Sequence, residues 1–441
     1  MKDWNGYEIS GTDATGLEHL ERAAAQLRCY IEDPVASVEK AIAANPGSVM
    51  SHILHAWMHL LATDATAFPV ARKSYERAMG LPANERERAH LRAIGLVLGN
   101  RWHAAGRVLE DLAVEWPLDS IALQAGHQID FFIGDSRMLR DRIARALPHW
   151  SPSMPGYHAL LGMHAFGLEE SGQYEPAEAQ GRRAVEIEPR DAWAQHAVAH
   201  VYEMQGRRRE GIAWMRDNEA GWVPENFFAV HNWWHVAVFY LGLDETDRAL
   251  ELFDTRVGPP ALTVIDLVDA SALLWRLELA GVDVGDRWQS VADRWMPHAA
   301  AGNYAFNDLH AMMAFVRTDR RDAIEQVLAA QERALAADDD NAMFTRDVGS
   351  ATTRAILAIA EGKPAEAVEL LRDVRNRAHR FGGSHAQRDL IDQTLIAAAS
   401  RAGLDRLARA LCDERLAART EPHVRWLAAI AAGRQAERLV A

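Results

Sequence analysis

Two pairs of histidines with the same spacing stand in neighbouring stretches of the sequence. His196 and His200 are four residues apart and are followed by Glu203, and His231 and His235 repeat the spacing in the motif HNWWH. Residues three or four positions apart share one face of an α-helix. Imidazoles held in this way can bind a divalent transition metal or exchange protons near neutral pH. The stretch 193–235 is therefore the first candidate for a functional site.

Three chemistries could use these side chains, and the sequence leaves all three open. The first is metal binding by imidazole nitrogens and a carboxylate; the ligands would be His196, His200 and His231, completed by Glu203, Asp269 or Asp308. It would differ from the metalloprotease motif, because Ala197 rather than a glutamate follows His196. The second is metal-free acid–base catalysis by a histidine that an acidic residue orients. The third is the binding of a small polar molecule or a short peptide.

The candidate residues fall into two groups by expected role. Those expected to take part in acid–base or metal chemistry are His196, His200, Glu203, His231 and Asp308. Those expected to contact a substrate are His127, Glu169, Trp193, Trp234, His235, Asp269, Asn307, His310 and Arg388. The guanidinium of Arg388 is suited to an anionic group. Each histidine has the alternative of being a packed core residue, and His52, His55 and His59, which share a face without a carboxylate at matching spacing, are interpreted in that way.

Composition and charge restrict the class of protein. Hydrophobic residues make up 49% of the 441 residues and charged residues 25%, which is ordinary for a folded chain. The formal net charge of −14 argues against nucleic acid and anionic membrane surfaces as partners. Cys29 and Cys412 suggest neither a disulfide framework nor a thiolate metal site. Because no apolar signal core or membrane-spanning run is present, we expect a cytoplasmic protein.

Motifs for several other chemistries are absent from the sequence. There is no glycine-rich phosphate loop, no dinucleotide fingerprint and no G-x-S-x-G turn. These absences argue against a nucleotide or flavin cofactor and against a serine nucleophile of that type. The cofactor stays unknown, with a divalent transition metal as the candidate. The oligomeric state is also open, and a homo-oligomer is compatible with the sequence.

The elements that must position these side chains are helices. Helical periodicity with alanine-rich faces runs through nearly the whole chain and is broken by short stretches with Gly, Pro or Asp. Residues 158–191 carry Gly172, Tyr174, Ala177, Ala184 and Pro189 at the offsets of a tetratricopeptide repeat, a helix pair of about 34 residues. The best signatures lie in 158–256. We predict an all-α fold, a right-handed α-solenoid of degenerate tetratricopeptide-like helix pairs that curves strongly around a central pocket.

No linker or low-complexity tract divides the chain. We therefore predict one helical-repeat domain over residues 1–441, with residues 1–25 as a lead-in segment. Helices are expected from about Gly16 to Ala44, before a turn at Asn45-Pro46-Gly47. A late helix is expected to begin after Gly383, with Ser384 as its N-cap.

The repeat register predicts which side chains face the concave side of the solenoid. His196, His200 and Glu203 fall on inward positions of one first helix. His231 falls on the corresponding face of the next pair, and Asp130 on that of an upstream pair. Ionisable residues from several repeats are therefore expected to point toward one concavity.

Several longer phrases resemble the tetratricopeptide repeat protein 38 family. They are SVMSHILHAW near the start, ALPHW at 146–150, GMHAFGLEESGQY at 162–174, DAWAQHAVAHVYEMQG at 191–206, HNWWH at 231–235, VIDLVDASALLWRLELAGVDVGDRW at 264–288, FNDLHAMMA at 306–314, RDVG at 346–349 and GGSHAQRD at 382–389. The resemblance covers nearly the whole chain and implies an all-helical repeat fold. It implies no particular reaction, but it places the candidate histidines and carboxylates in the family pattern. Gln128 departs from that pattern, which often has Asp at this position.

The function predicted from the sequence is that of a small-molecule enzyme, with hydrolysis as the leading reaction class. Its pocket would be lined by His, Asp and Glu on the concave face of the solenoid. The alternative is a scaffold whose groove binds a peptide or a partner helix. An enzyme needs a confined pocket, whereas a scaffold needs a long open groove and tolerates loss of the histidines.

Overall fold

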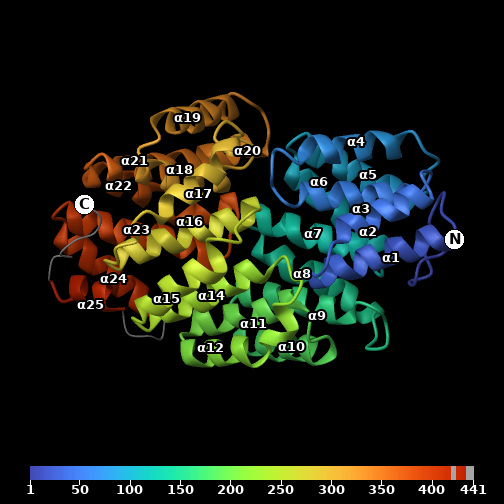
Figure 1. Cartoon of the computed structure of the whole chain (residues 1–441), viewed down its shortest axis with the longest axis horizontal. Coiled ribbons are helices and arrows are strands. Elements are labelled where there is room, and N and C mark those ends of the chain that lie inside the picture. Colours follow the sequence, from blue (N-terminus) through green and yellow to red (C-terminus); the bar gives the residue numbers. More distant parts are fainter. Residues whose placement is uncertain (419–423, 434–441) are drawn as a thin grey trace. The chain divides into compact units, whose positions relative to one another are not determined.

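The computed structural model describes residues 1–418 and 424–433, and these residues are almost entirely helical (Figure 1). Only two isolated bridges, Lys2 with Glu8 and Ile31 with Asn226, join extended residues in the described part. Within these same residues, no helix combines the length and the apolar character that crossing a bilayer requires. The predicted all-α helix-pair fold is confirmed.

The chain forms two compact units. The first comprises Met1–Val198 and Asn218–Ala229, and the second comprises Ala199–Asp217 and Val230–Ala441. Two of the three boundaries fall inside helices, α11 (Ala192–Gln205) and α14 (Ala229–Gly242), and the third follows Asp217. The single repeat domain over the whole chain and its curvature around a central pocket stay predictions.

The first unit is built from helices that follow one another through short connections. They are α1 (Ala14–Cys29), α2 (Pro34–Ala44), α3 (Val49–Leu60), α4 (Phe68–Met79), α5 (Glu85–Leu98), α6 (Trp102–Glu115), α7 (Ser120–Phe132), α8 (Ser136–Ala146), α9 (Tyr157–Glu170), α10 (Tyr174–Ile187) and the short α13 (Glu219–Trp222). A 3₁₀ turn at Leu147–His149 follows α8. Helix α1 begins inside the predicted lead-in segment, and α2 ends at the predicted turn.

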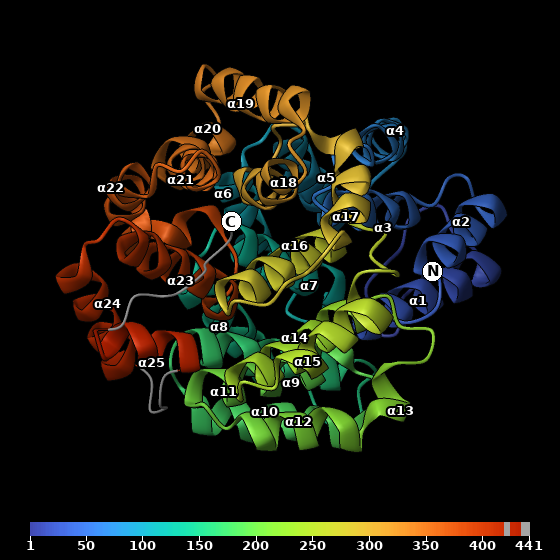
Figure 2. The same ribbon diagram turned by 60° about the vertical axis from the view of Figure 1, so that its left-hand side comes forward.

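The second unit continues the same plan. Its helices are α12 (Arg208–Asp217), α15 (Thr246–Leu252), α16 (Val264–Leu279), α17 (Arg287–Trp295), α18 (Ala305–Arg317), α19 (Arg321–Leu335), α20 (Asp340–Phe344), α21 (Ser350–Ala360), α22 (Pro364–Val374), α23 (His385–Arg401), α24 (Asp405–Ala418) and α25 (Arg425–Ala431). Short 3₁₀ or π-helical turns lie at Phe253–Val257, Met296–His298, Thr345–Gly349 and Arg375–Phe381. Helix α16 packs against α17, α18 and α23 (Figure 2).

The helix pair predicted over 158–191 is present as α9 and α10, which pack against each other. Gly172 in the connection has a φ of +74°, a left-handed conformation that glycine adopts without steric cost. Ala177 and Ala184 are fully buried where the two helices meet, and Pro189 lies just beyond the end of α10. Small side chains let the helices approach, and proline prevents the helix from continuing.

A second close approach fixes α9 against the preceding helix. A Cβ atom at Gly167 would lie 2.4 Å from the backbone nitrogen of Arg140 on α8. Only glycine therefore permits this distance between the backbones of α8 and α9. The glycine in GMHAFG is thus a packing residue of the first unit.

The predicted N-cap of the late helix is confirmed. The hydroxyl of Ser384 accepts a hydrogen bond from the backbone nitrogen of Gln387, and the Gln387 side chain accepts one from the backbone nitrogen of Ser384. This reciprocal capping box satisfies two amides that the first turn of α23 leaves without helical partners. Asn84 with Glu87 and Thr263 with Asp266 form the same arrangement at α5 and α16.

Candidate functional site

The two histidine pairs lie on α11 and α14, as their spacing predicts. The ring centroids of His200 and His235 are 4.5 Å apart, and those of His231 and His235 are 4.9 Å apart. These three residues belong to the second unit. His200 and His235 are completely buried, and His231 is 6% exposed. Three imidazoles therefore meet in the interior of this unit.

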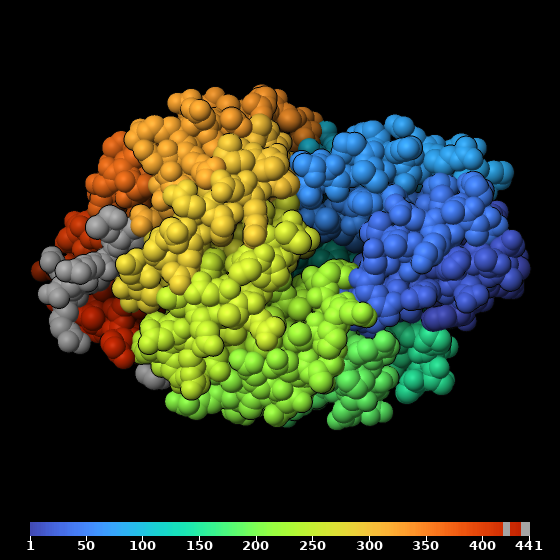
Figure 3. Space-filling model, viewed as in Figure 1, coloured from blue at the N-terminus to red at the C-terminus, as the bar shows by residue number. Residues whose placement is uncertain are grey.

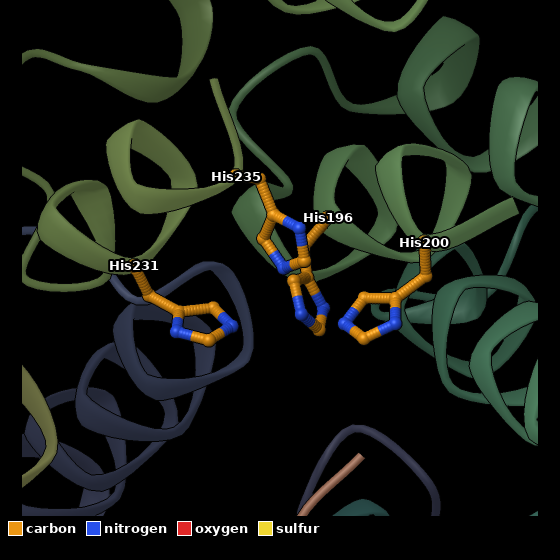
Figure 4. A group of neighbouring side chains, drawn as sticks. All are labelled: His196, His200, His231 and His235. Carbon is orange, nitrogen blue, oxygen red and sulfur yellow. The ribbon is translucent and has the colours of Figure 1, made fainter. Parts of the chain in front are cut away.

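His196 joins this group through its own helix. It lies one turn before His200 on α11, so the continuous helix sets its position relative to His200. One ring nitrogen from each of His196, His200, His231 and His235 can be chosen so that all four lie within 4.8 Å of one another. Figure 4 shows the four imidazoles converging from the two helices. We call these four residues the histidine cluster.

An acidic residue orients one member of the cluster. Nδ1 of His231 lies 2.8 Å from Oδ2 and 3.0 Å from Oδ1 of Asp269 on α16, and both side chains are buried. Burial raises the pKa of Asp269, and the contact with His231 opposes this rise. If Nδ1 donates to the carboxylate, Nε2 of the neutral ring keeps its lone pair for a metal or a proton. This is the carboxylate–histidine arrangement that commonly supports metal ligands.

The environment of His235 favours its neutral form. Burial lowers the pKa of His235 well below its usual value, and His200, His231 and Arg276 act in the same direction. A neutral imidazole can bind a metal ion without first releasing a proton. The state of His235 is therefore the one that metal coordination requires.

The donor set of the cluster fits a divalent transition metal. Imidazole nitrogens suit Zn²⁺, Cu²⁺, Ni²⁺ and Fe²⁺, and Zn–N distances are about 2.0–2.1 Å. From nitrogens within 4.8 Å of one another, each ring would have to move by about 1 Å or less to reach such distances. The carboxylate of Asp269, hydrogen-bonded to His231, would partly compensate the charge of a bound cation.

Within each unit, aromatic rings lie against a histidine of the cluster. In the first unit, His196 contacts the rings of Phe166, Trp193 and Phe228 at centroid distances of 5.3, 4.9 and 5.3 Å. In the second unit, Trp234 stacks on His231 with its ring 5.5 Å away and 14° from parallel. From the side shown in Figure 3, the green and yellow-green part of the second unit presents a closely packed surface. Trp193 and Trp234 are both buried.

The remaining candidates are divided between the two units. His127, Glu169 and Trp193 lie with His196 in the first unit; Glu203, Trp234, Asn307, Asp308, His310 and Arg388 lie in the second. All are buried except Arg388, which is half-buried. Convergence of the whole set on one pocket stays a prediction, because the set spans both units.

Arg388 and His127, two of the predicted substrate-binding residues, each contact neighbouring residues of their own unit. The guanidinium of Arg388 donates to the carbonyl oxygens of Gly382 and Gly383 before α23. The ring of His127 packs edge-on against Phe166 and Trp193, and burial lowers its pKa to about 3. His127 is therefore neutral at pH 7.

Asp308 is a buried carboxyl of the predicted set whose pKa is raised. Its Oδ2 accepts a hydrogen bond of 3.3 Å from Gln331, and burial raises its pKa to about 7. Nearby on α18, Nδ1 of His310 is hydrogen-bonded to the carbonyl of Phe306, and burial lowers the His310 pKa to about 4. A carboxyl that titrates near neutrality is suited to proton transfer, which supports its place among the catalytic candidates.

Asp308→Asn is expected to change how stability depends on pH. The Asp308 pKa is about 7 in the folded chain and about 3.9 in the unfolded chain. Because the folded pKa is raised, protonation stabilises the fold fully below about pH 4, and this contribution is lost as the pH rises toward about 7. Asparagine does not titrate. The unfolding free energy of Asp308→Asn minus that of the parent should therefore grow by about 1.4 kcal/mol per pH unit, or about 2 kcal/mol from about pH 5 to about pH 6.5.

Urea unfolding at several pH values measures this difference. Asp322→Asn, at an exposed position on α19, is the control for the substitution itself. A flat difference for Asp308→Asn would show that the carboxyl is not held protonated by its surroundings.

Sequence reasoning missed a buried polar chain in the first unit. Trp57 donates to Nδ1 of His90, and Nε2 of His90 lies 3.0 Å from Asp119. Asp119 also pairs with Arg86 at 2.8 Å, and its pKa is low despite burial because His90 and Arg86 stabilise its charge. The signal in the sequence was Asp119 directly before α7, where its side chain caps the helix by accepting from Ala122. His90 is a satisfied structural histidine.

The sequence indicates that His52, His55 and His59 are packed residues without a carboxylate partner. The structure places a carboxylate from another helix near one of them. Nε2 of His55 lies 3.8 Å from Glu39 on α2, and Nδ1 of the same ring bonds the hydroxyl of Ser74 at 2.8 Å. Glu39 lies on α2 and the three histidines lie on α3, so the spacing of residues within one helix could not reveal this contact.

Comparison with known proteins adds little to this description. No family model matches the chain. One solved structure, the tetratricopeptide repeat domain of P58(IPK), is 12% identical over 89% of this chain and 99% of its own length, with a TM-score of 0.21. At that TM-score the likeness carries no argument about function. The repeat fold therefore rests on the helix pairs of this chain, and membership of the family named from the sequence phrases stays a prediction.

Proposed function

We propose that this helical-repeat protein binds a divalent transition metal through the histidine cluster. The observation that carries the proposal is the convergence of His200, His231 and His235 in the interior of the second unit, with Asp269 hydrogen-bonded to Nδ1 of His231. His196 would supply a fourth nitrogen from the same helix as His200. Packed core histidines rarely gather in such numbers with a carboxylate behind one of them, because each buried ring must find its own hydrogen-bond partners.

The hydrolytic enzyme expected from the sequence would build on this metal. A metal held by histidines supplies a Lewis acid and lowers the pKa of bound water. The residues of this chain would then have two tasks: Asp269 would fix the orientation of His231, and Asp308 would hold or release a proton near neutral pH. The substrate class, a small molecule, follows from the sequence prediction alone.

Elemental analysis of the full chain purified without added metal tests the proposal. A stoichiometric transition metal is expected. If the metal is lost during purification, titration of the protein with Co²⁺ should give the absorption typical of coordinated imidazole nitrogens. Failure to bind Zn²⁺ or Co²⁺ in calorimetry, with the protein folded, would contradict the metal site and leave metal-free acid–base chemistry.

A scaffold that binds a peptide or protein is the second candidate, and the architecture of both units favours it. Helix-pair repeats present extended surfaces that accept peptides or partner helices. On the architecture alone, a binding role is better supported than an enzymatic one, because it requires no reaction. The burial of nearly all the predicted inward residues means that such a partner would contact other side chains.

A peptide-display selection on the full chain separates the two candidates. A scaffold should yield peptides that bind the parent and the variant His200→Gln with equal affinity. If no peptide is enriched, or if binding is lost in His200→Gln while folding is retained, the scaffold interpretation loses its support.

A further inference from the structure

A cavity of about 450 Å³ opens in the first unit, apart from the histidine cluster. Three segments and Trp4 form it: the segments are the second half of α1 with the residues that follow, residues 153–158 at the start of α9, and residues 187–190 at the end of α10. Its charged and ionisable lining residues are Arg22, Arg28, Glu32, His158, Glu188 and Arg190. The volume lies within the range of about 300–1,000 Å³ that small-molecule sites occupy.

Two of the three arginines in this wall have an acidic partner. Arg22 pairs with Glu32 at 2.9 Å, and Arg190 pairs with Glu188 at 2.9 Å. His158 lies 2.7 Å from Asp191, which is buried behind the wall. The two arginine–glutamate pairs carry no net charge.

Arg28 is the exception. Its side chain is 7% exposed, and no carboxylate in the described part of the chain lies within ion-pair distance of its guanidinium. The guanidinium donates to the hydroxyl of Ser120 at 3.2 Å and lies over the ring of Trp4, while its Nε makes no hydrogen bond within the described residues. Buried arginines are almost always paired, because removal of their charge from water is costly. Arg28 therefore lines the cavity as a buried cation without a direct ion pair; Glu21 and Asp191 act on its charge only from beyond ion-pair distance.

The start of α9 adds a second source of positive potential at the same wall. Gly156, the residue before α9, has a φ of +86° and no side chain to cap the helix. It lies so close to Arg28 that a Cβ atom at this position would be 2.9 Å from Nε. The amino end of a helix carries a partial positive charge that favours anions. The helix end and the buried guanidinium thus act on one region of the cavity.

We propose that this cavity binds the carboxylate group of a small organic acid, with Arg28 as its counter-ion. A single negative charge fits because one arginine has no direct ion pair, whereas the carboxylates of Glu32 and Glu188 in the same wall would repel a second charge. The rings and side chains of Trp4, Ile31 and Pro155 line the cavity as well and would contact the hydrocarbon part of the acid. The site is independent of the proposed metal.

Calorimetric titration of the full chain with benzoate tests this proposal, with benzamide as the neutral analogue of the same shape. Benzoate should bind and benzamide should not. Arg28→Met should weaken benzoate binding by about tenfold or more, because a charge-assisted hydrogen bond is lost. Arg183→Met, at an exposed position of α10 where the arginine pairs with Glu186, is the control and should leave binding unchanged.

A charge swap at the rim covers the case in which Arg28→Met fails to fold. Ser153 lines the cavity and is exposed, so both charges are tolerated there. Ser153→Glu should weaken benzoate binding and Ser153→Lys should strengthen it, each by a few-fold. Equal affinities in these two variants, equal binding of benzoate and benzamide, or tighter binding of inorganic phosphate than of benzoate would each overturn the proposal.

Discussion

Replacement of His200 by alanine is expected to weaken Zn²⁺ binding by more than about 100-fold. Loss of a residue that only supports a ligand costs about 10- to 100-fold in metal affinity, so loss of a ligand should cost more. His200 is completely buried and its ring lies 4.5 Å from that of His235. Competition with a chromophoric chelator measures the affinity in the parent and the variant.

Two further variants make this result specific. His200→Gln keeps a polar side chain of similar size, so it should fold even if the alanine variant is unstable, and it should lose Zn²⁺ binding to the same extent. His52→Ala removes another buried histidine, one that bonds the carbonyl of Pro46 in the first unit, and should leave the affinity unchanged. Unchanged affinity in both folded His200 variants would sink the proposed metal site.

Asp269 should have a smaller and distinct effect. Asp269→Asn keeps an oxygen that can accept from Nδ1 of His231 but removes the charge. We expect Zn²⁺ affinity to fall by about tenfold, at the low end of the range for supporting residues. A loss as large as that of His200→Ala would indicate that Asp269 itself binds the metal.

Asp130→Ala is expected to lower the free energy of unfolding by about 3–5 kcal/mol, the cost of leaving a buried charge without its partner. The guanidinium of Arg142 on α8 donates to both oxygens of Asp130 on α7, at 2.7 and 2.8 Å, and also to the carbonyl of Gly106 on α6. Both charged side chains are almost completely buried. The pair therefore joins three helices of the first unit.

Chemical denaturation of paired variants isolates this effect. Asp141→Ala removes a carboxylate on α8 that pairs with Arg137 and Arg140 near the surface, and it should cost less than about 1 kcal/mol. The double variant Asp130→Leu with Arg142→Met should recover most of the stability, because neither charge remains buried. If Asp130→Ala costs no more than Asp141→Ala, the buried pair contributes little.

The repeat spacing predicted Asp130 as an inward-facing residue near His127, but the structure gives its carboxylate to Arg142. The spacing of residues along one helix defines a face and says nothing about what a neighbouring helix places opposite it. Arg142 lies twelve residues away, on the next helix, at no spacing that a helix pattern singles out. The carboxylate beside His55 was missed for the same reason.

The resemblance to a repeat family and the best helix pair came directly from local signals. Gly172, Ala177, Ala184 and Pro189 act within one pair, so their offsets predict α9 and α10. The cap at Ser384 was likewise predictable, because hydroxyl and amide lie within one turn. The absence of a direct ion pair at Arg28 had no such local signal, because the spacing of residues does not show which distant side chains surround an arginine.

The sequence by itself determined that the chain is helical, where a well-formed helix pair begins and ends, and that four histidines occupy matching faces of two helices. These properties depend on interactions within a few residues, which spacing and composition record. Only the tertiary structure decided that Asp269 lies behind His231, that His200, His231 and His235 are buried together, and that Arg28 lines a cavity without a direct ion pair. Such pairings join residues that are far apart in the chain, and packing and desolvation decide them.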